Sequence, residues 1–364
     1  MKDRLDRYLT SRVPFLSRTR LQRLIESGGA TVNARPAKPS TRLRLGDTVE
    51  LVIPLPEGTS IRPEPIDLDV LYEDEHLIVL NKRPGIIVHP ARSENSGTII
   101  NALAWRFQHQ TGGALSTVGE EFARPGVVHR LDRDTTGCIV FAKQDEAHWK
   151  LGAQFEHRRV EKRYLALVHG SFEPQVDVID LPIGPHPSRE KGYREKHVVR
   201  HDEFGKASLT IARVVERYRV GEPELGPEAV EGGDRSRLRR ETGSESRSTP
   251  SRTGSESRST YSLLELELKT GRTHQIRVHL SYRGYPIVGD DMYAGRPLLD
   301  PAGGTVIARQ ALHAALLEFD HPISGERLRF EAPPPPDFAA ALALCRAGAV
   351  DPVNAPGRLV TLAE

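Results

Sequence analysis

The chain has 364 residues, of which 38% are hydrophobic and 27% are charged, an ordinary composition for a soluble protein with room for two or three domains. Its formal net charge is only +2, so any binding of nucleic acid has to come from local patches. It has no apolar run long enough to span a bilayer, no signal-peptide core, and only two cysteines, which predicts a cytoplasmic protein without a disulfide framework or zinc cluster.

The first 50 residues carry a local excess of positive charge, with eleven Lys and Arg residues against five Asp and Glu residues. Leu5 and Leu9 repeat at helical spacing, and Ser17 is placed to cap a second helix. Two strands follow, one beginning at Thr31 and one over residues 43–53. On the second helix Arg20 and Arg23 face outward, with Arg18 in the first turn, and we expect these arginines to lie along a phosphate backbone.

Residues 54–65 are rich in proline and polar residues, which predicts a linker after an N-terminal domain of residues 1–53. Residues 66–72 alternate between apolar and polar, and residues 76–81 form a second strand, so the two predict a β-hairpin. The hairpin leads into the turn Asn81-Lys82-Arg83-Pro84-Gly85, which precedes Val88-His89-Pro90. Lys82 fits this turn either as an RNA contact or as a structural lysine.

The segment from His129 to Gly137, His-Arg-Leu-Asp-Arg-Asp-Thr-Thr-Gly, has the character of a site. It is a polar loop in front of an apolar run that predicts a buried strand. Four charges fall within five positions, which is costly to bury unless the charges are paired or used: Arg130, Asp132, Arg133 and Asp134. A carboxylate among arginines stays ionised, because nearby positive charge favours the charged form. Such a group acts as a nucleophile or base and not as an acid.

The chain after this motif alternates between predicted helix and strand. Residues 147–155 predict an amphipathic helix, and a basic segment then enters a strand at Tyr164. Residues 183–200 form a basic loop that either lies over RNA or is solvated. Residues 221–260 repeat one eight-residue sequence and have almost no aromatic or branched apolar residues, which predicts a flexible insertion between two paired strands.

The last third of the chain predicts a period-two strand from Leu264 and a helix capped by Thr273 and closed by Gly284. Ile276 and Leu280 face inward on this helix. From residue 337 the sequence predicts a short helix and then a tail.

These motifs resemble those of the RluA-type pseudouridine synthases. The resemblance rests on residues 129–137, on the turn before Val88-His89-Pro90, and on Gly271-Arg-Thr-His-Gln-Ile-Arg277. It implies that Asp132 is the nucleophile, that Tyr164 stacks on the target uracil, and that Arg277 pairs with Asp132. Arg130 resembles the arginine inserted where the base leaves the stack, and we place His129 and Lys82 among the RNA contacts.

The resemblance implies an α+β fold. A mixed, largely antiparallel catalytic sheet with flanking helices and a central cleft is expected over residues 66–336. A small α/β N-terminal domain resembles the alpha-L RNA-binding domain of a small-subunit ribosomal protein, and residues 337–364 form a C-terminal helix and tail. The family implies no metal and no cofactor, and we expect a monomer.

The implied activity is isomerisation of specific uridines to pseudouridine. Domain order and motifs are closest to the type that modifies large-subunit ribosomal RNA, so RNA, and the large ribosomal subunit or its precursor, are the expected partners. Transfer RNA is the alternative substrate. An RNA glycosidase that uses Asp132 and Asp134 is a rival enzyme class, and a non-catalytic ribosome-assembly protein is a third interpretation.

Overall fold

The computed structural model describes residues 4–13, 18–52, 61–90, 96–118, 124–188, 195–221 and 258–351. The chain forms two compact units, Met1–Ser60 and Ile61–Glu364. Among the described residues, no helix combines the length and the apolar character needed to cross a membrane. Most of the predicted insertion at 221–260 and the tail beyond Asp351 lie outside the described residues.

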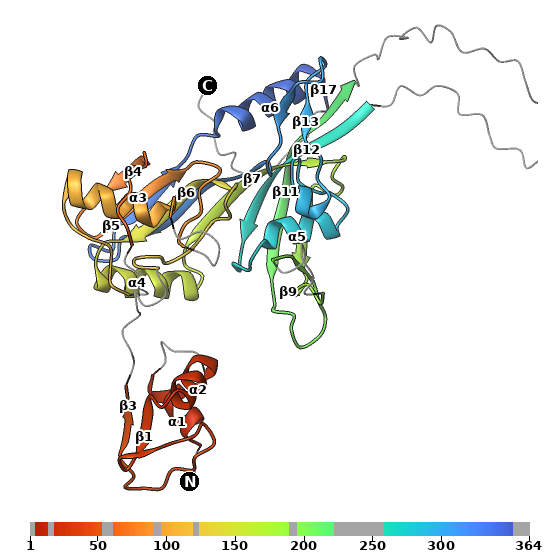
Figure 1. Cartoon of the computed structure of the whole chain (residues 1–364). Coiled ribbons are helices and arrows are strands. Elements are labelled where there is room, and N and C mark those ends of the chain that lie inside the picture. The colour runs from red at the N-terminus through yellow and green to blue at the C-terminus, as the bar shows by residue number, and fades with distance from the viewer. Residues whose placement is uncertain are drawn as a thin grey trace, which may run out of the picture. The chain divides into compact units, whose positions relative to one another are not determined.

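The N-terminal unit packs two helices against a small sheet (Figure 1). Its core contains Leu5 and Leu9, which repeat at helical spacing in the sequence, together with Leu21 and Ile25 of the second helix. The second predicted strand is much shorter than residues 43–53, and the predicted cap Ser17 lies outside the described residues. The elements are α1 (Leu5–Arg12), α2 (Arg18–Glu26), β1 (Ala30–Val32), β2 (Arg35–Pro36) and β3 (Val49–Leu51), with sheet order β2-β1-β3.

The second unit is built on a ten-stranded sheet with the order β17-β11-β12-β7-β15-β6-β5-β4, in which β16 also pairs with β15 and β8 with β11. Its strands are β4 (Asp69–Glu73), β5 (Leu77–Lys82), β6 (Thr136–Ala142), β7 (Glu161–His169), β8 (Val176–Asp180), β11 (Leu209–Gly221), β12 (Arg258–Leu268), β15 (Leu312–Asp320), β16 (Arg327–Glu331) and β17 (Ala349–Asp351). In the described part of the sheet every pairing is antiparallel except that of β6 with β15. The predicted mixed, largely antiparallel sheet is confirmed.

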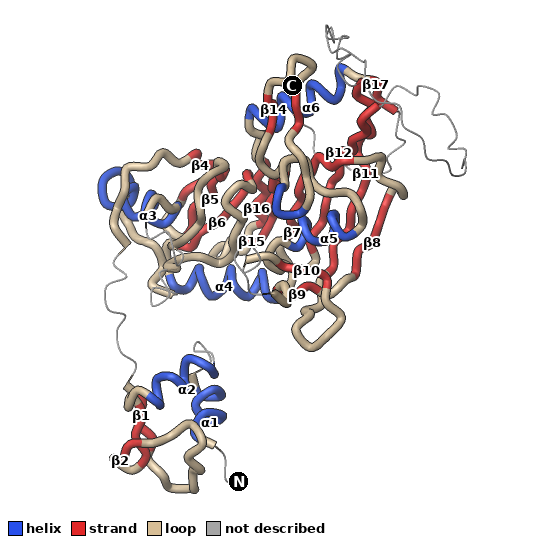
Figure 2. The backbone as a smooth tube through the Cα atoms, turned by 45° about the vertical axis from the view of Figure 1, so that its right-hand side comes forward, coloured by secondary structure: helices blue, strands red, loops and turns tan. Residues whose placement is uncertain are grey.

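Helices cover different parts of this sheet. The helices α3 and α4 lie beside the β4–β6 half, whereas α5 and α6 lie beside β11 and β12 (Figures 1 and 2). Their bounds are α3 (Ile99–Arg106), α4 (Asp145–Glu156), α5 (Gln275–Tyr282) and α6 (Pro336–Ala347), with a π-helix at Phe107–Thr111 and a 3-10 helix at Asp291–Tyr293. Short strands complete the unit: β9 (Ile183–Pro185), β10 (His197–Val199), β13 (Leu298–Leu299) and β14 (Thr305–Ile307).

Burial explains why these segments form their elements. All of β6 is buried, as the apolar run after Gly137 predicted. In β12, Leu264 and Leu266 are buried while Glu265 and Glu267 are half-buried, which is the expected period of two. β11 and β12 pair on either side of the predicted insertion, from Thr210–Leu268 to Gly221–Arg258.

One predicted helix start is wrong. The N-cap of α5 is His274, in the left-handed conformation with φ 56°, and not Thr273. The helix has no side-chain cap, and Gln275 instead holds the chain before the helix, because its Oε1 accepts hydrogen bonds from the Thr270 hydroxyl (2.8 Å) and the Arg272 backbone N–H (3.0 Å). Gly284 has φ +86° and follows the helix as predicted.

Candidate active site

Asp132 lies in a loop that enters β6 through Gly137. Gly137 has φ +105°, and a Cβ atom there would lie 2.2 Å from the carbonyl oxygen of Ala314 on β15. Only glycine therefore allows β6 and β15 to approach each other as a parallel pair at this point. This close pairing fixes the end of the loop next to the centre of the sheet.

Lys82 supports the same loop from beneath. Its side chain is buried, with the residue only 2% exposed, and its Nζ donates to the backbone oxygens of Arg83 (3.1 Å), Arg133 (2.5 Å) and Thr135 (2.9 Å). Burial lowers its pKa to about 7. The ammonium faces protein carbonyls, so the predicted RNA contact is replaced by the structural role that the turn also allowed.

Asp134 does not share the environment of Asp132. One of its carboxylate oxygens accepts a hydrogen bond from the Gly85 backbone N–H (3.2 Å), and its own carbonyl oxygen accepts one from Arg309 (2.9 Å). Asp134 forms no ion pair with another described residue, although its negative charge acts to raise the pKa of the buried Lys82 against the larger effect of burial.

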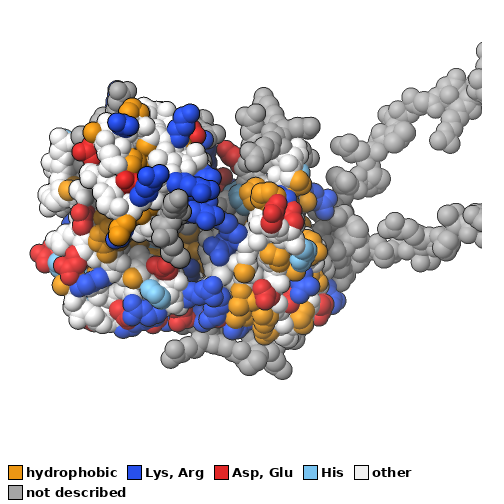
Figure 3. Space-filling model, turned by 90° about the horizontal axis from the view of Figure 1, so that it is seen from below, with side chains coloured by type: hydrophobic (Ala, Val, Ile, Leu, Met, Phe, Trp, Pro, Cys, Tyr) orange, Lys and Arg blue, Asp and Glu red, His pale blue; other side chains and the backbone are white. Residues whose placement is uncertain are grey.

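A cavity of about 790 Å³ opens above the loop. Its walls come from the loop at 128–135, from α4, from β7, and from residues 267–277 between β12 and α5. Asp132 and Tyr164 both line it. On the face of the molecule drawn in Figure 3, Lys and Arg side chains gather in local groups with acidic side chains between them, in keeping with the small net charge.

Arg277 holds Asp132 from the helix side. Its Nη1 donates to Asp132 Oδ2 at 3.0 Å, and its Nε and Nη2 donate to the two oxygens of Asp290 at 2.7 and 2.8 Å. Burial acts to lower the pKa of Arg277, but Asp290 and Asp132 outweigh burial and raise it above its ordinary value. The guanidinium is therefore a permanent cation between a fully buried carboxylate and the carboxylate that faces the cavity.

His274 lies on the other side of Asp132, with its Nε2 3.8 Å from Asp132 Oδ2. The Tyr293 hydroxyl accepts a hydrogen bond from the His197 backbone N–H (3.0 Å), so its own proton is free to be donated to His274 Nδ1 (2.9 Å). That assignment leaves the proton of the neutral ring on Nε2, facing the cavity. Burial lowers the pKa of His274 to about 4, so the ring is neutral near pH 7.

Tyr164 faces the cavity from the central strand β7 and is 7% exposed. Burial first, and then the charge of Asp132, raise its pKa well above the ordinary value. The hydroxyl therefore stays protonated at neutral pH. A protonated, nearly immobile ring beside a carboxylate offers a flat apolar face to a planar base.

Arg130 and His129 differ in how firmly the protein holds them. Arg130 lines the cavity, is exposed, and makes no hydrogen bond or ion pair with another described residue. His129 stacks on Phe155 with ring centroids 4.6 Å apart, and its Nε2 accepts from the Val140 N–H at 3.0 Å. Burial lowers the pKa of His129 to about 3. Arg130 is thus available to a ligand, whereas His129 is tied into the loop.

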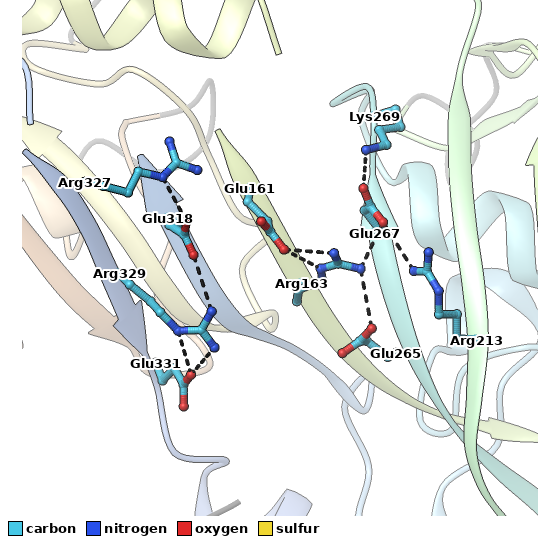
Figure 4. Close-up of polar contacts among 10 residues, drawn as sticks. All are labelled: Glu161, Arg163, Arg213, Glu265, Glu267, Lys269, Glu318, Arg327, Arg329 and Glu331. Carbon is cyan, nitrogen blue, oxygen red and sulfur yellow. Dashed lines mark hydrogen bonds and ion pairs between the residues drawn. The ribbon is translucent and has the colours of Figure 1, made fainter. Parts of the chain in front are cut away.

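Cations on the neighbouring sheet surface already have partners (Figure 4). Arg163 of β7 lies between carboxylates of its own and the adjacent strand, 2.8 Å from Glu161 and 2.9 Å from Glu267. Glu267 also binds Arg213 (3.2 Å) and Lys269. A phosphate that engaged these cations would have to displace carboxylates. A separate group on β15 and β16 pairs Glu318 with Arg327 and Arg329, and Glu331 with Arg329.

The three N-terminal arginines are placed differently from one another. Arg18 forms an ion pair with the buried Asp6 at 2.7 Å, and its side chain is 47% exposed. Burial acts to raise the pKa of Asp6, but hydrogen bonds from Arg4, Arg18 and Gln22 outweigh it and hold the pKa far below its ordinary value. Arg23 is exposed on α2. The side chain of Arg20 lies outside the described residues.

Sequence reasoning missed Asp290, Tyr293 and His274 as members of the site. Asp290 and Tyr293 belong to the Gly289-Asp-Asp-Met-Tyr293 motif, and His274 stands three residues before Arg277. His274 could have been identified from its position inside the motif Gly271-Arg-Thr-His-Gln-Ile-Arg277, which also supplies Arg277. The local sequence does not indicate that Asp290, and not Asp291, faces Arg277, because this choice depends on the path that the chain takes after α5.

Comparisons with known proteins identify the families that the two parts of the chain match. The family model described as RNA pseudouridylate synthase matches residues 76–282, and the S4 domain model matches residues 3–49. The resemblances predicted for the two parts of the chain are confirmed. A human protein described as RNA pseudouridylate synthase domain containing 4 has a similar fold, with a TM-score of 0.51 and 22% identity over 79% of this chain and 95% of that chain.

Two bacterial relatives align over nearly the whole chain. The uncharacterized RNA pseudouridine synthase YlyB of Bacillus subtilis is 36% identical, covering 93% of this chain and 92% of that protein. The ribosomal large subunit pseudouridine synthase D of Zymomonas mobilis is 37% identical, covering 92% of this chain and 91% of that protein.

Proposed function

The chain belongs to the RNA pseudouridylate synthase family, whose members are isomerases acting on RNA, and on that premise we propose that Asp132 is its catalytic carboxylate and large-subunit ribosomal RNA its substrate. The observation that carries the proposal is the placement of Asp132. Its carboxylate lies 3.0 Å from the guanidinium of Arg277, lines the cavity, and is 18% exposed.

The main chemical group that the reaction requires from the protein is such a carboxylate. The bond between ribose C1′ and uracil N1 breaks, the base turns, and a bond forms from C1′ to C5, after which C5 loses its proton to solvent and N1 takes one up. Asp132 serves either as nucleophile at C1′ or as base toward a ribose proton, and both routes need the ionised form. Arg277 orients this carboxylate, because its Nη1 donates a charge-assisted hydrogen bond to Asp132 Oδ2.

Two further residues act on the base. Tyr164 stacks on the uracil from the floor of the cavity, and its hydroxyl stays protonated. Arg130 enters the position that the flipped base leaves, because its guanidinium is exposed at the cavity and free of partners among the described residues. Flipping costs a few kcal/mol, and a stacked guanidinium offsets part of that cost.

The choice of ribosomal RNA rests on the relatives and on the N-terminal unit. Several relatives are named as large-subunit ribosomal pseudouridine synthases, and the N-terminal unit matches the S4 domain. Arg23 is an exposed arginine of that unit, and Arg18 is half-exposed while bound to Asp6. Transfer RNA remains the alternative substrate, since the same catalytic residues serve either RNA.

The environment of Asp134 argues against an RNA glycosidase. A hydrolase of that kind needs a second carboxylate aimed at the sugar, whereas the carboxylate of Asp134 is engaged by the Gly85 N–H. A purely structural assembly protein would leave the buried arrangement of Asp290, Arg277 and Asp132 without a use. The glycosidase would release free uracil, and the assembly protein would form no product.

The test is tritium release from transcripts labelled at uridine C5, run in parallel on large-subunit ribosomal RNA, transfer RNA and a large-subunit particle. We expect release without free uracil, and the highest rate on ribosomal RNA, alone or within the particle. Free uracil that still carries its tritium, with no release of tritium to water, would establish the glycosidase. A higher rate on transfer RNA would replace the proposed substrate while leaving the chemistry intact.

A further inference from the structure

Lys162 is a cation in the catalytic cavity that the mechanism above does not use. It lies on β7 two residues before Tyr164 and lines the same cavity. Successive residues of a strand point to opposite faces, so Lys162 and Tyr164 extend from the same face of β7. The lysine therefore enters the cavity on the side where the tyrosine meets the base.

The ammonium of Lys162 has no anionic partner among the described residues. The Nζ of Lys162 lies 5.7 Å from the centroid of the Phe155 ring. The adjacent Arg163, by contrast, is bound by Glu161, Glu265 and Glu267. Burial lowers the pKa of Lys162 to about 8, and no carboxylate compensates for that burial. A partly buried, unpaired cation is costly unless an anion arrives to meet it.

We propose that Lys162 forms an anion subsite that binds a phosphate group adjacent to the target uridine. The inference rests on the proposed function, in which Tyr164 stacks on the uracil. Two residues along a strand span about 6.6 Å, which is comparable to the separation of a base from the phosphate of its own nucleotide. With the base on Tyr164, a phosphate of the same nucleotide reaches the side chain of Lys162, where its charge replaces the missing internal partner.

Five other cations near the cavity are less suited to this role. Arg163 and Lys269 would have to give up carboxylates, Arg277 is bound between two, and Lys82 is buried under the loop. Arg130 is free, but the proposed function uses it at the vacated base position. Among the described residues, Lys162 is therefore the lysine of the cavity whose charge has no carboxylate partner and can bind the substrate.

Small ligands test the subsite without any need for turnover. The probes are uridine and uridine 3′,5′-bisphosphate, with binding measured by calorimetry on the full chain. Wild type should bind the bisphosphate more tightly than the nucleoside. Lys162→Met should weaken bisphosphate binding about tenfold or more and leave uridine binding unchanged, because one charge-assisted contact is lost. Lys162→Arg should restore most of the affinity.

The matched control is Lys150→Met. Lys150 lies on α4, is half-exposed, and forms an ion pair with Glu146 at 2.7 Å. It does not line the cavity, so its removal should leave bisphosphate binding unchanged. Equal bisphosphate affinity in wild type and Lys162→Met, equal losses in the two lysine variants, or no preference of wild type for the bisphosphate would each overturn the subsite.

A second readout uses RNA. For a single-stranded RNA, the slope of log affinity against log salt should fall by about 0.7 in Lys162→Met, the value for one lost phosphate contact, and an unchanged slope would contradict the subsite. Tritium release measured on the same proteins separates the two claims. Release by wild type with no effect of Lys162→Met on phosphate binding refutes the subsite alone. A loss of phosphate binding in Lys162→Met, with no release by wild type, refutes the proposed function alone.

Discussion

Replacing Lys82 with methionine should separate catalysis from stability. The substitution removes the donor for two backbone oxygens that flank the turn after Asp132, the buried one of Thr135 and the partly buried one of Arg133. An unpaired buried acceptor costs about 1–3 kcal/mol, so the two together cost at most about 6 kcal/mol. Burial of the ammonium itself costs about 5 kcal/mol, because its pKa falls from 10.5 to about 7. The two terms oppose each other, so the free energy of unfolding should change little.

Turnover, by contrast, should fall. Without Lys82 the loop moves to satisfy its carbonyls with water, and a displacement of Asp132 by about 1 Å costs about 100-fold in rate. The assay is single-turnover tritium release at saturating enzyme, with thermal unfolding measured on the same samples. Arg83→Met is the control, since that side chain is exposed and adjacent. Wild-type rates in Lys82→Met, or equal losses in both variants, would refute the supporting role of Lys82.

Three further outcomes are expected. Asp290→Ala should lose about 3–5 kcal/mol of stability in chemical denaturation, because it breaks a buried ion pair with Arg277, and an unchanged midpoint would contradict that pair. Between pH 7 and about 10 the unfolded chain keeps the proton that folded Lys82 releases, so wild-type stability should rise with pH relative to Lys82→Met; a constant difference would count against the lowered pKa. Deleting residues 1–53 should weaken RNA binding and its salt dependence without abolishing the chemistry, and unchanged affinity across a salt series would remove the N-terminal unit from RNA binding.

The sequence predicted those features that depend on local periodicity. The alternation from Leu264 onward predicted β12, and the apolar run after Gly137 predicted β6, because burial of one face or both faces leaves a direct trace in the residue types. The helix at 147–155 was predicted for the same reason and spans Asp145–Glu156. Family motifs then indicated that Asp132 and Arg277 belong together, and they lie 3.0 Å apart.

What the sequence could not predict depends on contacts between distant segments. The parallel pairing of β6 with β15 joins residues 177 positions apart, from Thr136 to His313, and it determines which side of the Asp132 loop faces the cavity. The sequence allowed Lys82 either an RNA contact or a structural role. The structural role emerges only when β5 pairs with β6 and the lysine is buried. The start of α5 was mispredicted because Thr273 is a good capping residue by type, whereas a left-handed residue precedes the helix instead.

The helix α3 was missed for a related reason. Its N-terminus has a capping box in which Thr98 and Asn101 bond each other's backbone N–H groups. Asparagine at the third position is not the glutamate or glutamine that normally marks such a box in a sequence. Both residues are fully buried, so their mutual hydrogen bonds are needed to satisfy them inside the protein.

The central claim is that Asp132, and not its neighbour two residues later, carries the chemistry. Tritium release should therefore be compared in wild type, Asp132→Asn and Asp134→Asn on the same labelled ribosomal transcript. Both substitutions preserve shape, and Asp134→Asn keeps an oxygen that can accept from the Gly85 N–H. We predict that release is abolished in Asp132→Asn, with RNA binding retained, and is close to wild type in Asp134→Asn. Full release by folded Asp132→Asn would contradict the account.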